Sequence, residues 1–170
     1  MTGYGSHSFL NDYIRENLVR KIMEIGVHNG DNAKKMVEVA SESVPSSEVE
    51  YYGFDYFEND SRFDGVKKKL SETGCEFNLF KGDSKEVLSD AVNQLPDMDL
   101  IFIDGGHDYE TARSDWENSK KLMNSETAVF FHNYNYSGTK KAVDSISKDN
   151  FRVEILNPRN DYDSAFVKRK

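Results

Sequence analysis

Two kinds of hydrophobic pattern alternate along the chain. Short runs rich in apolar residues predict β-strands, and segments with an apolar residue every three or four positions predict helices. The apolar runs lie at 19–25, 49–54, 77–80, 100–103, 128–131, 151–156 and 165–168. Helical spacing occupies 31–43, 61–71, 84–95, 139–148 and a segment that Asp108 caps and that carries Tyr109, Trp116 and Met123 as packing residues. We expect one short helix within the segment 1–17, and we expect His7 to be disordered.

This alternation predicts an α/β fold, a Rossmann-like three-layer sandwich around a seven-stranded, mostly parallel sheet. The run Leu100–Ile103 is apolar at every position, as expected of a central strand that is covered on both faces. The last two strands are joined by residues 157–161 with no helix between them. They therefore form a hairpin, which makes the last strand antiparallel.

Length and charge narrow the classes of function. A chain of 170 residues predicts a single domain over 1–170. The 22 Lys and Arg against 30 Asp and Glu give a net charge of -8, which disfavours nucleic acid as a partner. No apolar run is long enough to span a membrane, and the first residues lack the pattern of an export signal. With one cysteine, Cys75, interpreted as a passive strand residue, we expect a cytoplasmic protein, and a homo-oligomer is left open.

Candidate binding residues follow the predicted strands, because ligands of open α/β sheets bind outside the carboxyl ends of the strands. After the first strand come Glu24, Gly26 and Gly30, and the glycines allow the backbone to approach a ligand closely. This turn lacks the second glycine of the G-x-G-x-x-G dinucleotide motif, so a nicotinamide cofactor is disfavoured. Asp31 is expected to cap the following helix, and His28 to be exposed.

The next two strand ends also carry polar groups. Asp55 ends the second strand, where its carboxylate can accept hydrogen bonds from both hydroxyls of a ribose. After the third strand, Asp83 and Ser84 begin a helix. They are interpreted either as ligand-binding residues or as a helix N-cap alone.

These ordered strand ends resemble those of class I S-adenosylmethionine-dependent methyltransferases, over residues 19–170. The resemblance implies that Glu24, Gly26 and Gly30 hold the methionine part of the cofactor and that Asp55 binds its ribose. It also implies that Asp83 and Ser84 border the adenine, and that Asp104 belongs to the cofactor site as well.

A second motif, Ile103-Asp104-Gly105-Gly106-His107-Asp108-Tyr109-Glu110, is followed later by Phe131-His132-Asn133. It resembles the I-D-G-x-H-x-Y-E and F-H-D motifs of small-molecule and sugar O-methyltransferases, with Asn133 in place of the final acid. Catechol-type relatives bind a divalent cation such as Mg²⁺ at equivalent strand ends. That similarity implies Asp104, His132 and Asn133 as metal ligands, although His132 replaces an acid of the catechol type.

The function implied is methyl transfer from S-adenosylmethionine to an oxygen of a small molecule or sugar. Asp104, His107 and His132 are the candidate catalytic residues, since an imidazole titrates near neutral pH and can act as a general base. Alternatively, His107 only tightens the glycine turn and His132 only positions a loop. Two rival functions remain: a nucleotide-sugar or dinucleotide-dependent enzyme, and a non-catalytic binding module with the same fold.

Overall fold

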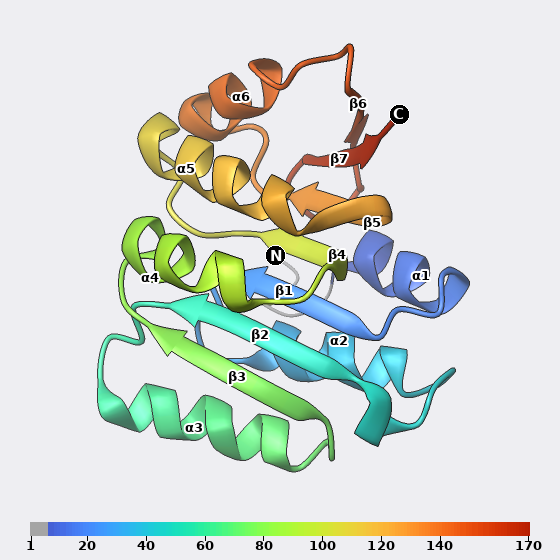
Figure 1. Ribbon diagram of the computed structural model, residues 1–170, viewed down its shortest axis with the longest axis vertical. Helices are drawn as coiled ribbons and strands as arrows, with labels where there is room; N and C mark the ends of the chain where they lie inside the picture. Colours follow the sequence, from blue (N-terminus) through green and yellow to red (C-terminus); the bar gives the residue numbers. More distant parts are fainter. Residues whose placement is uncertain (1–6) are drawn as a thin grey trace.

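A seven-stranded sheet runs through the middle of the molecule (Figure 1), in a computed structural model that describes residues 7–170. The order is β3-β2-β1-β4-β5-β7-β6, and β7 runs antiparallel to both of its neighbours. The strands are β1 (Lys21–Ile25), β2 (Glu50–Asp55), β3 (Glu76–Lys81), β4 (Met98–Ile103), β5 (Met123–Phe131), β6 (Phe151–Leu156) and β7 (Ser164–Arg169).

Helices cover both faces of this sheet. One layer contains α1 (Ser8–Glu16), α2 (Asp31–Ala40) and α3 (Asp60–Ser71), and the other contains α4 (Ser84–Ala91), α5 (Tyr109–Ser119) and α6 (Ser137–Asp144). Single 3-10 turns lie at Ser46–Glu48, Val92–Gln94 and Lys120–Leu122. No helix of residues 7–170 is long and apolar enough to cross a membrane.

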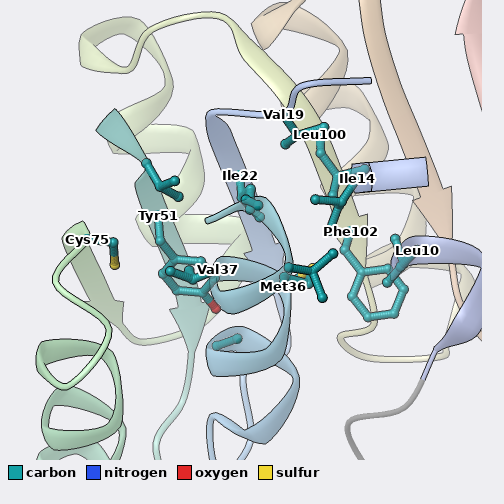
Figure 2. Packing of buried hydrophobic residues seen from close by; sticks show 14 of the residues in the cluster. Leu10, Ile14, Val19, Ile22, Met36, Val37, Tyr51, Cys75, Leu100 and Phe102 are labelled. Atoms are coloured by element: carbon teal, nitrogen blue, oxygen red, sulfur yellow. The ribbon is translucent and has the colours of Figure 1, made fainter. Parts of the chain in front are cut away.

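Successive residues of the central strands point into two different cores, because side chains alternate across a strand. Ile22 packs against α1 and α2, whereas Met23 packs on the α4–α6 side. Figure 2 shows the first core, where Ile14 of α1 and Met36 of α2 lie against Phe102 of β4. The second core surrounds Trp116 and Phe131. Two buried faces explain why β4 is apolar at nearly every position.

The predicted α/β fold, with its antiparallel last strand, is confirmed. Several local predictions were wrong. Met123 begins β5 instead of lying in a helix, because the 3-10 turn before it ends the helical segment. Gly30, with a φ of 79°, caps α2 in place of Asp31, which is the first residue of the helix. The last helix spans Ser137–Asp144 instead of 139–148.

Candidate active site

A cavity of about 790 Å³ opens at the carboxyl ends of β1, β2, β4 and β5. The order of the strands reverses between β1 and β4, whose carboxyl ends lie side by side. Loops that leave these two strands toward opposite layers separate there and leave a crevice. The fold therefore places a cavity at the strand ends where the sequence predicts the site.

Gly26 forms the floor of this crevice. Its φ is 92°, and a Cβ built on it would lie 2.1 Å from the main-chain oxygen of Asp104. The turns after β1 and β4 thus contact each other through main-chain atoms. A side chain on residue 26 would push the two turns apart.

Replacing Gly26 with alanine is expected to lower the free energy of unfolding by at least about 2 kcal/mol, through strain and steric clash. Gly65, in the interior of α3, has nothing within 4 Å of its built Cβ. Gly65→Ala is the matched control and should stabilise the protein by about 0.5–1 kcal/mol. Urea denaturation measures both, and a Gly26→Ala variant as stable as the Gly65→Ala variant would contradict the close contact.

Glu24 lies beside this floor with only 1% of its surface exposed. Its carboxyl group accepts hydrogen bonds from the Tyr51 hydroxyl and, at 2.8 Å, from Asn32 Nδ2. Burial raises its pKa to about 8, although the two hydrogen bonds lower it. A buried carboxyl group of this kind gains its charge most easily beside a cationic ligand.

Asp55 anchors the loops around the second strand end. One carboxylate oxygen accepts from His28 N at 2.8 Å and the other from Phe57 N at 2.6 Å. His28 and Phe57 both have positive φ values, 53° and 45°, which side chains other than glycine rarely adopt. Each oxygen of Asp55 keeps further acceptor capacity toward the cavity that it lines.

The remaining predicted binding residues divide into two groups. Ser84 lines the cavity, but Asp83 and Gly30 are not among its lining residues. Asp83 caps α4 by accepting from Lys85 N at 3.0 Å, and Gly30 caps α2 with a built Cβ 3.1 Å from Val66. For these two residues the structure shows a role at the helix ends.

Asp104, His132, Asn133 and His107 form one hydrogen-bonded group. Asp104 Oδ1 lies 3.0 Å from His132 Nδ1 and also accepts from Asn133 Nδ2 at 3.0 Å. Asn133 Nδ2 lies 3.1 Å from His107 Nε2. Asn133 holds this position with a φ of 57°, a conformation that asparagine tolerates better than most residues.

Sequence reasoning missed two members of this group, His7 and Asp161. Asp161, between β6 and β7, lies 2.9 Å from His132 Nε2 and 2.5 Å from His7 Nδ1. His7 is only 8% exposed, so the expectation that it is disordered was wrong. Neither residue belongs to a periodic segment, and the last hairpin brings Asp161 to the site only in the folded chain.

His132 lies between two carboxylates, and this sets its charge. Burial lowers the pKa of His132, but the hydrogen bonds with Asp104 and Asp161 outweigh burial and raise it above the ordinary value of 6.5. Burial raises the pKa of Asp161, but the hydrogen bonds from His7 and His132 outweigh burial, and the pKa is lowered overall. The imidazole is therefore protonated more readily than a free histidine.

The donor groups here do not fit a Mg²⁺ ion. Mg²⁺ requires oxygen ligands in near-octahedral geometry, but Asp104 is the single carboxylate of the predicted set. Its Oδ1 already accepts from His132 and Asn133, and the Nδ2 of Asn133, not its oxygen, faces Asp104. His7, Asp104 and His132 bring one nitrogen or oxygen each within 4.8 Å of one another, a mixed set that suits transition metals better.

Asp115 is a further buried carboxyl group, in α5 behind the glycine turn. It is 0% exposed, and Oδ2 lies 3.3 Å from a Cβ built on Gly105. Burial raises its pKa to about 7, and neither carboxyl oxygen has a hydrogen-bond partner among the described residues. Asp115 thus lies between the turns after β3 and β4, a role that its place in a helical segment did not reveal.

A scan against protein-family models matches residues 23–134 to a methyltransferase domain. The chain therefore belongs to this methyltransferase family. The match spans well over half of the chain, from within β1 to just beyond β5, and it confirms the class I S-adenosylmethionine-dependent methyltransferase predicted from the motifs. A search of curated protein sequences found no match.

Solved structures of methyltransferases share the fold. The apo structure of CalS11, a TDP-rhamnose 3'-O-methyltransferase of calicheamicin biosynthesis, is 18% identical with a TM-score of 0.77, covering 94% of this chain and 77% of that one. An O-methyltransferase from Bacillus cereus in complex with SAH is 17% identical with a TM-score of 0.78, covering 95% and 79%. TomG from Streptomyces achromogenes, in complex with SAM, is 13% identical with a TM-score of 0.74, covering 95% and 78%.

Proposed function

We propose that this methyltransferase uses S-adenosylmethionine to methylate a hydroxyl oxygen of a small molecule. The observation that supports this most strongly is the pair of Asp104 and His132 at the cavity wall, next to the floor formed by Gly26. Asp104 holds a proton on Nδ1 of His132, so that Nε2 becomes the basic nitrogen. That nitrogen faces Asp161, which also lines the cavity.

Glu24, Gly26 and Asp55 are the proposed holders of the methyl donor. S-adenosylmethionine supplies a methyl group already activated on a sulfonium. The carboxyl group of Glu24 binds the ammonium of the methionine part, and Asp55 accepts from the ribose hydroxyls. Ser84 borders the adenine, and the carboxylates that line the cavity favour a cationic donor.

His132 is the proposed general base. An acceptor hydroxyl that takes the place of Asp161 at Nε2 gives its proton to the imidazole, while the protein aligns the oxygen with the methyl group. Asn133 fixes Asp104 and, through His107, the glycine turn, so His107 is a positioning residue. We place this reaction in the cytoplasm, where the buried free thiol of Cys75 stays reduced.

Isothermal titration with S-adenosylhomocysteine, NAD and a UDP-sugar tests the cofactor. We expect only S-adenosylhomocysteine to bind. Asp55→Ala should weaken this binding by about 10–100-fold, because charged hydrogen bonds to the ligand are lost and His28 N and Phe57 N lose their acceptor. Asp55→Asn keeps one acceptor oxygen, so its affinity for S-adenosylhomocysteine should lie between those of Asp55→Ala and the wild type.

Two outcomes would refute this part of the proposal. Tight binding of NAD or the UDP-sugar without S-adenosylhomocysteine would indicate the rival nucleotide-dependent enzyme. An affinity of Asp55→Ala equal to that of the wild type would remove Asp55 from the cofactor site.

A further inference from the structure

The cavity extends beyond the residues assigned to the methyl donor. On the far side of Asp104 it is lined by His132, Tyr136 and Tyr162. Tyr136 and Tyr162 lie outside the residues that match the family model, which end at 134. The turn before α6 carries Tyr136, and the turn between β6 and β7 carries Tyr162.

Two partly exposed tyrosine rings form one wall of this end. Tyr136 is 44% exposed and Tyr162 is 50% exposed, and their ring centroids lie 6.0 Å apart. Tyr136 lies 4.8 Å from the His107 ring, and Tyr162 packs edge-on to His132 at 5.9 Å. Exposed aromatic rings that gather beside catalytic groups provide a surface for a flat apolar ligand.

Hydrogen bonds fix this wall in place. Asn135 and Asp163 bond reciprocally: Asn135 Nδ2 donates to the Asp163 carboxylate at 2.8 Å, and Asp163 N donates to Asn135 Oδ1 at 2.7 Å. Tyr134 N also donates to the Asp163 carbonyl at 2.8 Å. These hydrogen bonds join the turn that carries Tyr162 to the turn that carries Tyr136. The wall is therefore preformed before a ligand binds.

The charges around the cavity restrict the ligand further. Five carboxyl groups line it, and Lys85 is the one lysine or arginine among its lining residues in the described part of the chain. At the tyrosine end, Asp104 and Asp161 contact His132 and so lie beside any ligand that reaches it. A phosphate or carboxylate on the acceptor would be repelled by this set.

We propose that the acceptor is an uncharged aromatic hydroxyl compound, whose ring lies against Tyr136 and Tyr162. This inference rests on the proposed function. The hydroxyl occupies the place of the Asp161 carboxylate at His132 Nε2 and gives its proton to that nitrogen. The new bond joins the phenolic oxygen to the methyl carbon as the carbon–sulfur bond breaks, which leaves S-adenosylhomocysteine and the methyl ether. A nucleoside diphosphate sugar, as used by CalS11, is disfavoured by its charge.

The test has two stages, so that its failure and that of the proposed function are distinguishable. Calorimetric binding of S-adenosylhomocysteine first tests the cofactor alone. The loaded protein is then titrated with catechol, 4-methylcatechol, TDP-rhamnose and free rhamnose, and methyl transfer to each is followed by mass spectrometry. We expect binding and methylation of the two catechols, with 4-methylcatechol bound more tightly because its methyl group adds apolar contact area.

Variants of Tyr162 test the wall itself. Tyr162→Ala should raise the Kd of 4-methylcatechol about tenfold and leave the affinity for S-adenosylhomocysteine unchanged. Tyr162→Phe, which keeps the ring, should bind like the wild type. Ile155→Ala, on the exposed edge strand β6, is the control for an apolar residue away from the cavity. Tighter binding of either rhamnose compound than of the catechols, no binding of the catechols, or an unaltered Kd for Tyr162→Ala would overturn the proposal.

Discussion

Replacing His132 with alanine should lower kcat for methyl transfer by about 10²–10⁴-fold, the usual contribution of a general base. Affinity for S-adenosylhomocysteine should change little, because the proposed cofactor contacts come from Glu24, Gly26 and Asp55. Single-turnover kinetics at saturating donor and acceptor would measure the loss. Equal rates for the variant and the wild type would show that His132 only positions its loop.

The pH profile separates a base from a structural histidine. A base must lose its proton to act, and Asp104 and Asp161 raise the pKa of His132 above 6.5. The ratio kcat/KM, which reports the free enzyme, should therefore rise with pH through a midpoint above 6.5. Asp161→Asn removes one of the two carboxylates, so its midpoint should lie at lower pH, whereas a merely structural role leaves the midpoint unchanged. Circular dichroism would verify that both variants are folded.

The fold and half of the site followed from local sequence. Hydrophobic runs mark the strands, and parallel strands bring their carboxyl ends to one edge, so Gly26, Asp55, Asp104 and His132 could be placed together before any coordinates. Successive residues of the central strands enter different cores, because side chains alternate across a strand.

The other half depends on tertiary structure. His7, Asp161 and Tyr162 lie in irregular segments, and only packing of α1 and pairing of β6 with β7 bring them to His132. The sequence predicted that Gly30 binds the ligand, whereas in the structure Gly30 is the N-cap of α2. A glycine that follows a strand can serve either purpose. Nothing in the local sequence distinguishes these uses, since both require positive φ at the same position.

The substitution Glu24→Gln should stabilise the protein at pH 8 and weaken its binding of cofactor. The unfolded chain loses the proton of Glu24 near pH 4.5, whereas the folded chain keeps it until about pH 8. Between these values the folded state binds more protons, so the free energy of unfolding falls as pH rises. The accumulated cost reaches about 3–5 kcal/mol at pH 8. Glutamine has no proton to lose and can still bond with Tyr51 and Asn32.

The proton that Glu24 loses on becoming charged should also be released when the ligand binds. If the ammonium of the ligand charges Glu24, binding of S-adenosylhomocysteine at pH 7 should release close to one proton. Calorimetry in two buffers of different ionisation enthalpy measures it, and Glu24→Gln should release none. Thermal unfolding from pH 5 to 8 gives the stability difference, with the exposed Glu38→Gln of α2 as control. Equal pH dependence in Glu24→Gln and wild type would show that Glu24 is ionised before the ligand binds, because a carboxylate already charged has neither a folding cost nor a proton to release.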